Sequence, residues 1–233
     1  MKKGFGEDSK VKKNQINKIS EHNLIEKAIK LQIKGEIKQA AIYYKECINR
    51  KSNDANIYYN YGIILYELNN FKEAEVYTKK AIKIKPDFAS AYNNLGNIQR
   101  SLEKYFDAEI SFQKSIEINP NDAIFYFNLG NIQKQLKKYF DAELAFRKSI
   151  EINPNLAEVY NNLGNVLKES GKHKEAKDYL LKSIEINPNF AEAFNNLGGV
   201  FKDLGNTLDA ELNFKKAINL KYNYPIAHNN LGT

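Results

Sequence analysis

The stretch Ala91–Asn97 reads AYNNLGN and sets two adjacent asparagines and a glycine among apolar residues with helical spacing. Asparagine and glycine are weak helix formers, each costing several tenths to about 1 kcal/mol relative to alanine. The stretch nevertheless recurs as VYNNLGN at Val159–Asn165, as AFNNLGG at Ala193–Gly199 and, less completely, as FYFNLGN at Phe125–Asn131. This recurrence indicates that the unfavourable residues serve a purpose in the fold.

The glycine of this stretch belongs to a series with a constant step of 34 residues. Its members are Gly62, Gly96, Gly130, Gly164, Gly198 and Gly232. Alanines keep the same step from Ala40 to Ala210, and prolines keep it from Pro86 to Pro188. A fixed period in this range indicates a repeat architecture.

The repeated positions resemble the tetratricopeptide repeat, whose pattern is a large aromatic, Leu-Gly, a second large residue, Ala, an aromatic, a small residue and Pro. In the third repeat these are Tyr92, Leu95, Gly96, Gln99, Ala108, Phe112, Ser115 and Pro120, of which only Gln99 departs. The resemblance covers residues 21–233, with repeats at 21–54, 55–88, 89–122, 123–156, 157–190 and 191–224 and a partial seventh at 225–233. It implies an all-α fold, a right-handed α-solenoid of stacked helix-turn-helix hairpins.

The spacing inside one repeat agrees with this expectation. Tyr92, Leu95 and Gly96 fall at i, i+3 and i+4, on one face of a helix. Small residues let two helices approach closely, and proline stops the second helix because it cannot continue one. We also expect Asn155 and Asn189 to cap the following helices, with a glutamate three residues on completing a capping box.

An asparagine precedes each glycine by two residues, about 200° around the helix and therefore away from the packed seam. This series is Asn60, Asn94, Asn128, Asn162, Asn196 and Asn230, and Asn97, Asn131 and Asn165 lie one turn further along. In the family the first helix of each repeat lines the concave surface, so these residues would form a ladder down a groove. An amide can donate to and accept from a peptide backbone, and the arrangement is similar to the repeats of O-linked N-acetylglucosamine transferases. The alternative is a structural ladder that links neighbouring repeats.

Basic residues form a second ladder one turn beyond the asparagines. Its members are Arg100, Lys134, Lys168 and Lys202. Glu169 and Asp203 neighbour the last two, so the positive stripe is expected to be strongest over Arg100 and Lys134. It would favour an acidic segment of a partner, whereas the alternative is an ordinary solvated charged face.

Charge and composition exclude several classes of function. The net charge is +7, but six lysines against two acidic residues in 1–20 supply +4 of it, which leaves the repeats close to neutral. We therefore expect residues 1–20 to be a basic, disordered tail and expect no nucleic-acid partner. No apolar run reaches the length of a membrane span, so no membrane association and a cytoplasmic location are expected. Cys47, the one cysteine, falls where other repeats carry small residues and is expected to be buried.

No catalytic constellation is visible, and the three histidines lack metal-binding spacing. We therefore expect a non-enzymatic scaffold for protein or peptide partners, with no cofactor and no metal. The alternative is an N-terminal, substrate-presenting module of a larger transferase: a glycosyltransferase, sulfotransferase or methyltransferase. The seventh repeat stays in register to the last residue, so we expect either a longer polypeptide or end-to-end self-association. Richness in Lys, Asn and Ile makes the whole similar to tetratricopeptide repeat proteins of cyanobacteria.

Overall fold

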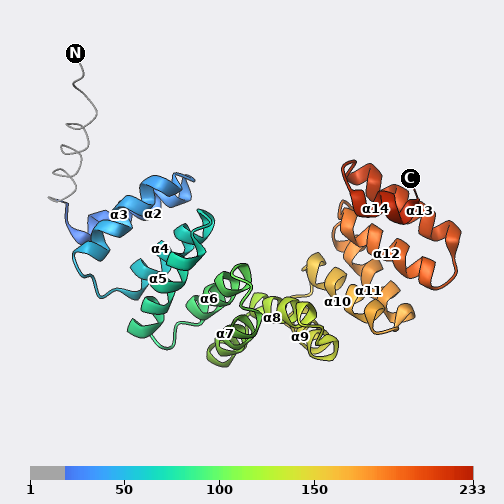
Figure 1. Cartoon of the computed structure of the whole chain (residues 1–233), viewed down its shortest axis with the longest axis horizontal. Helices are drawn as coiled ribbons and strands as arrows, with labels where there is room; N and C mark the ends of the chain where they lie inside the picture. Colours follow the sequence, from blue (N-terminus) through green and yellow to red (C-terminus); the bar gives the residue numbers. More distant parts are fainter. Residues whose placement is uncertain (1–18, 233) are drawn as a thin grey trace, which may run out of the picture. The chain divides into compact units, whose positions relative to one another are not determined.

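The computed structural model describes residues 19–232, and within that range every regular element is a helix (Figure 1). The chain divides into two compact units, Met1–Ile118 and Asn119–Thr233. All but the last two residues of the predicted basic tail lie outside the described range. Ser20, at its end, caps the first described helix by accepting a hydrogen bond from the backbone N–H of Asn23 (3.3 Å).

The first unit contains three helix pairs. Its helices are α2 (Glu21–Ile33), α3 (Ile37–Asn49), α4 (Ala55–Glu67), α5 (Phe71–Ile84), α6 (Ala89–Ser101) and α7 (Tyr105–Ile118). From α2 to α6 each helix packs on the next along the chain, α6 packs on α7, and α4 also contacts α6. Each pair therefore packs on the next mainly through its own second helix and the first helix of the following pair, and the stacking of repeats agrees with the 34-residue period.

The second unit contains three more pairs and one further helix. Its helices are α8 (Ala123–Gln135), α9 (Tyr139–Ile152), α10 (Ala157–Glu169), α11 (His173–Ile186), α12 (Ala191–Asp203), α13 (Thr207–Leu220) and α14 (Pro225–Leu231). Consecutive helices pack on each other throughout, and α10 contacts both α8 and α12. Stacked helical hairpins are therefore the architecture of both units.

Proline ends the second helix of four repeats, as the sequence predicts. Helices α5, α7, α9 and α11 end at an isoleucine two residues before Pro86, Pro120, Pro154 and Pro188. The residue before a proline is pushed out of the helical region by the proline ring. Each second helix therefore stops at the same place in its repeat.

The repeated glycine allows the two helices of one repeat to touch. A Cβ atom built on Gly96 would lie 2.6 Å from Cε1 of Phe112, closer than real Cβ atoms come. Gly130 stands in the same relation to Phe146, and Gly164 to Leu180, both also at 2.6 Å. The partner always follows 16 residues after the glycine, and we call this series the glycine-facing residues. They are Tyr44 (opposite Ala28), Thr78, Phe112, Phe146, Leu180 and Phe214.

The turn between the two helices of a repeat uses a left-handed residue. The residues with this conformation are Gly35, Asn69, Glu103, Lys137, Gly171 and Gly205, with φ between 58° and 77°. Left-handed backbone costs a residue with a Cβ atom about 1–2 kcal/mol. Glu103 and Lys137 carry that cost, which shows that the hairpin geometry overrides the local preference of the chain.

The prediction of capping boxes at Asn155 and Asn189 is wrong. Helix α10 has Leu156 and helix α12 has Phe190 at the N-cap, and neither side chain makes a capping bond. The asparagine before the proline makes the local side-chain bond instead: Oδ1 of Asn153 accepts a hydrogen bond from the backbone N–H of Asn155 (3.1 Å). This Asx turn encloses the proline, so the helix begins later than a cap at Asn155 would require.

Burial follows the repeat pattern. The buried cluster of the first unit includes Leu24, Tyr44 and Ile64, and that of the second unit includes Phe146 and Leu163. Cys47 is fully buried, as predicted. Burial, with a smaller contribution from the nearby Glu21 carboxylate, raises the pKa of the Cys47 thiol to about 11, so the thiolate is scarce at neutral pH.

Candidate functional site: the asparagine face

The asparagine face is the side of the first helices that carries the repeated asparagine and the residues three and six positions after it. In the third repeat these are Asn94, Asn97 and Arg100, and in the fifth they are Asn162, Asn165 and Lys168. Residues three apart lie on the same side of a helix. Most of these side chains are half-buried, whereas Asn128 is buried and Lys202 and Asn230 are exposed.

In the first unit the repeated asparagine donates to a hydroxyl group of the preceding repeat. Nδ2 of Asn60 lies 3.2 Å from the hydroxyl oxygen of Tyr44, and Nδ2 of Asn94 lies 3.3 Å from Oγ1 of Thr78. Both acceptors are glycine-facing residues. The Tyr44 hydroxyl donates in turn to Oε1 of Gln32 (3.2 Å).

In the last three repeats, the repeated asparagine donates to another amide of the preceding repeat. Nδ2 of Asn196 lies 2.8 Å from Oδ1 of Asn161, and Nδ2 of Asn230 lies 2.9 Å from Oδ1 of Asn195. Asn162 donates to Oδ1 of Asn131 at 2.7 Å. Asn131, predicted as a groove residue, therefore serves here as an acceptor between repeats.

The glycine-facing residue explains the change of acceptor. Residues 16 before Asn162, Asn196 and Asn230 are Phe146, Leu180 and Phe214, which have no hydroxyl group. The amide nitrogen must then find another acceptor, because an unpaired, half-buried donor costs stability. An asparagine of the preceding first helix supplies it.

Asn161 and Asn195 immediately precede members of the series and are themselves buried, with 1% and 6% of their surface exposed. Nδ2 of Asn161 lies 3.3 Å from Oε1 of Glu192 and 3.4 Å from Oδ1 of Asn162. Because Oδ1 of Asn161 also accepts from Asn196, both the nitrogen and the oxygen of this side-chain amide are bonded within the protein. It connects the fifth repeat to the sixth.

The four basic residues of the predicted stripe have different surroundings. Lys134 is half-buried, its Nζ lies 3.5 Å from Oδ1 of Asn162, and burial lowers the pKa of its amino group against a smaller opposing effect of Glu192. Nζ of Lys168 lies 3.8 Å from a carboxylate oxygen of Glu169 and 3.9 Å from one of Asp203. The sequence predicts that Glu169 and Asp203 offset the positive charges of Lys168 and Lys202. In the structure both carboxylates lie beside Lys168.

Several polar groups of the face have no partner among residues 19–232. They are the amides of Asn97 and Asn165, the guanidinium group of Arg100 and the amino group of Lys202. Within the same range no group of histidine, cysteine, aspartate or glutamate side chains could hold a metal ion. The chemistry that this face offers is hydrogen bonding and the attraction of negative charge.

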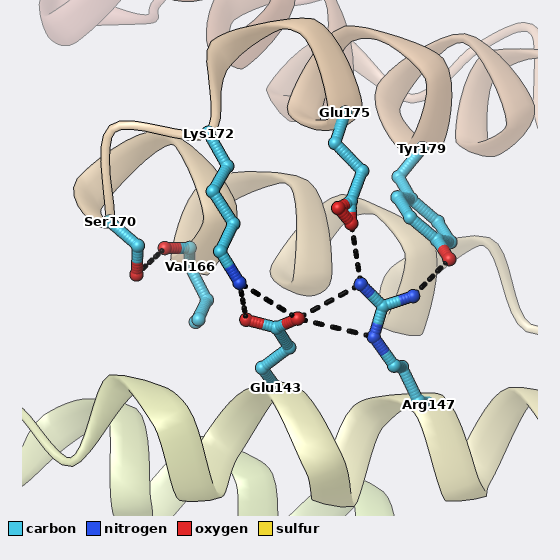
Figure 2. Close-up of polar contacts among 7 residues, drawn as sticks. All are labelled: Glu143, Arg147, Val166, Ser170, Lys172, Glu175 and Tyr179. Atoms are coloured by element: carbon cyan, nitrogen blue, oxygen red, sulfur yellow. Dashed lines mark hydrogen bonds and ion pairs between the residues drawn. The ribbon is translucent and has the colours of Figure 1, made fainter.

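An ion-pair cluster between the fourth and fifth repeats was not predicted from the sequence. Figure 2 shows Glu143 and Arg147 of α9 facing Lys172, Glu175 and Tyr179 of the next repeat. Nζ of Lys172 lies 2.9 Å from Oε2 of Glu143, and a guanidinium nitrogen of Arg147 bridges Glu143 (2.9 Å) and Glu175 (2.6 Å).

The first unit repeats part of this cluster. Glu75, which is 8% exposed, accepts from Lys79 and Lys104, each at 2.7 Å. Glu75 and Glu143 are two 34-residue steps apart, as are Lys104 and Lys172. This shared period was the signal in the sequence that could have identified the ion pairs.

A cavity of about 520 Å³ lies beside the last three helices of the second unit. Its apolar lining comes from Ala210 and Phe214 of α13 and Leu231 of α14, and the rest is polar or charged. Lys202 and Asn230 of the asparagine face also line it. The face and the cavity are therefore adjacent.

Comparison with known proteins identifies the family. Tetratricopeptide repeat models match residues 55–88, 89–122, 111–143, 157–190 and 179–211. The chain belongs to the tetratricopeptide repeat family, whose members are protein-interaction scaffolds, as the sequence analysis expected. No curated protein matches the chain.

Solved structures share the fold over most of the chain. YrrB, described as a TPR protein with an unusual peptide-binding site, is 24% identical with a TM-score of 0.68, over 82% of this chain and 98% of its own. MamA is 26% identical with a TM-score of 0.65, over 69% of this chain and 94% of its own. Pseudomonas aeruginosa pilF is 17% identical with a TM-score of 0.78, over 90% and 95%. YrrB and pilF, both below 25% identity, are evidence for the fold alone.

No helix among residues 19–232 has both the length and the apolar character needed to cross a membrane.

Proposed function

We propose that this scaffold binds an extended peptide segment of a partner protein on the asparagine face. The observation that supports the proposal is the set of unpaired polar groups on that face. They are the Asn97 amide and the Arg100 guanidinium group in the first unit, and the Asn165 amide and the Lys202 amino group in the second. A free amide can pair with both the C=O and the N–H of a peptide unit, whatever the side chains of that peptide. Several such bonds, each worth about 0.5–1.5 kcal/mol, are needed for useful affinity.

The charges of the face favour an acidic side chain in the bound segment. Arg100 in the first unit and Lys202 in the second have no carboxylate partner among the described residues, whereas Lys168 has two nearby. Guanidinium groups bind carboxylates in a two-pronged geometry that adds specificity. We therefore expect acidic residues to be enriched in bound peptides, most clearly through Arg100.

Selection from a display library of random twelve-residue peptides on the full chain tests this function. We expect enriched peptides whose binding falls by about two- to tenfold for each of Asn97→Ala and Asn165→Ala. Gln113→Ala is the matched control, because Gln113 is an exposed amide on a second helix, away from the face. The proposal fails if no peptide is enriched, or if the enriched peptides bind the two asparagine variants as tightly as the unchanged chain.

A further inference from the structure

Five asparagines of the 34-residue series are bonded to the preceding repeat through the amide nitrogen. In each case Nδ2 donates a hydrogen bond to a side chain of the preceding repeat. The five residues are Asn60, Asn94, Asn162, Asn196 and Asn230. An amide nitrogen is a donor only, and an amide oxygen is an acceptor only. The direction of these bonds therefore determines what the side chains can still offer.

The oxygen ends differ between members of the series. No described residue donates to Oδ1 of Asn60, Asn94, Asn196 or Asn230. The oxygens of the half-buried Asn60, Asn94 and Asn196 are not among the fully buried side-chain atoms without a partner, so each keeps some contact with solvent. Asn230 is an exposed residue. Asn162 is the exception, because its Oδ1 already lies 3.4 Å from Nδ2 of Asn161 and 3.5 Å from Nζ of Lys134.

We propose that the series recognises hydrogen-bond donors only, and that within each unit its open Oδ1 atoms accept bonds from backbone N–H groups of a bound segment. These atoms belong to Asn60 and Asn94 in the first unit and to Asn196 and Asn230 in the second. The proposal rests on the proposed function and specifies its chemistry. The amide nitrogens hold neighbouring repeats together, while the oxygens bind the partner. Asn162 belongs to the inter-repeat network alone.

Backbone N–H groups are favoured as the donors over lysine or arginine side chains. The unpaired charges of the face, Arg100 and Lys202, are positive and would repel a cationic segment. An extended chain also presents its N–H groups on alternating sides, one every second residue, so a row of acceptors can meet several of them. The bound chain should therefore lose affinity when individual N–H groups are removed.

Substitution of asparagine by aspartate separates the two ends of the amide. Asn94→Asp removes the nitrogen but keeps acceptor oxygens, and the Thr78 hydroxyl can donate in the reverse direction, so the fold is preserved. With uncharged peptides from the selection, we expect Asn94→Asp to bind within about twofold of the unchanged chain. Asn94→Ala should bind about two- to tenfold more weakly.

The second unit supplies an independent pair of variants. Asn196→Asp should lower the unfolding temperature, because the bond to Oδ1 of Asn161 is lost, yet retain peptide binding below that temperature. Asn162→Ala should lower the unfolding temperature and leave affinity unchanged. Loss of affinity in Asn94→Asp and Asn196→Asp equal to that in Asn94→Ala would overturn the proposal, because the nitrogens would then be the binding groups.

Ester-substituted peptides test the partner side. Replacing one backbone N–H at a time by an ester oxygen should weaken binding at alternate residues by about two- to tenfold. Peptides that tolerate every ester, or that depend on lysine or arginine side chains instead, would overturn this inference while leaving the proposed function intact. Failure to enrich any peptide would remove the proposed function and this inference together.

Discussion

At the scale of single residues, the same asparagine has different bonding partners in different repeats. Asn94 donates to the hydroxyl of Thr78, whereas Asn196 donates to Asn161 because the equivalent residue, Leu180, has no hydroxyl. A glycine-facing residue thus packs against the glycine of its own repeat and determines the acceptor used by the next. One substitution at such a residue changes both contacts.

Gly130→Ala should destabilise the chain by about 1–3 kcal/mol, because the added Cβ atom would lie 2.6 Å from the buried ring of Phe146. Gly199→Ala is the matched control, since it lies in a first helix and its nearest atom, Cε of Lys168, is 3.5 Å away. There the helix preference for alanine should raise stability by up to about 1 kcal/mol. Urea unfolding followed by circular dichroism measures both, and equal effects of the two substitutions would contradict the packing role assigned to Gly130.

At the scale of helices, charged side chains join consecutive repeats on the side of the second helices. Burial raises the pKa of the Glu143 carboxyl, but Lys172 and Arg147 together lower the pKa by more, so that it lies below the ordinary value. The pKa of Glu75 is lowered in the same way by Lys104 and Lys79. The ionised carboxylate is therefore more stable in the folded chain than in the unfolded one.

The stabilisation from Glu143 should be complete above the unfolded pKa of a glutamate, about 4.3, and should disappear as the pH falls through the lower folded pKa. Glu143→Gln should cost about 1 kcal/mol at neutral pH, a modest value because Lys172 and Arg147 are partly exposed and can be resolvated. This difference from the unchanged chain should shrink on acidification. Thermal unfolding at pH 7 and at pH 3 measures it, with Glu151→Gln at an exposed pair as control. A difference that persists at low pH would show that the Glu143 charge is not the cause.

At the scale of the whole molecule, a cavity with a partly apolar lining lies beside α12, α13 and α14, and no side chain among residues 19–232 fills it. Apolar surface of this kind is stabilised by contact with another apolar surface. The end-to-end self-association expected from the sequence stays a prediction, and the cavity is the place where it would occur.

Sedimentation velocity over a range of concentrations tests this expectation. The mean mass should rise with concentration for the unchanged chain. Leu231→Asp, which places a charge in the cavity lining, should suppress that rise. A mass equal to one chain, 26.8 kDa, at every concentration would contradict self-association.

The amino-acid sequence alone was sufficient to predict the repeat period, the helix pairs, the close approach at the glycines and the burial of Cys47. These features depend on contacts within one repeat or on local backbone preferences, which recur every 34 residues and can be read from the spacing. The prediction of the helix starts was less accurate where it depended on side-chain caps, because the turns around Pro154 and Pro188 use the asparagine before the proline.

Only the tertiary structure decided which atoms of the asparagine series remain available. The choice between Thr78, Asn131 and Asn161 as acceptor depends on the distance and chemistry of side chains from the preceding repeat. The ion pair between Glu143 and Lys172 has the same origin, because the two residues are 29 positions apart and meet only when repeats stack. A hydrogen bond needs its donor and acceptor close together and roughly in line. Spacing in the sequence identifies a shared face but does not provide that geometry, which comes from the packing of one repeat on the next.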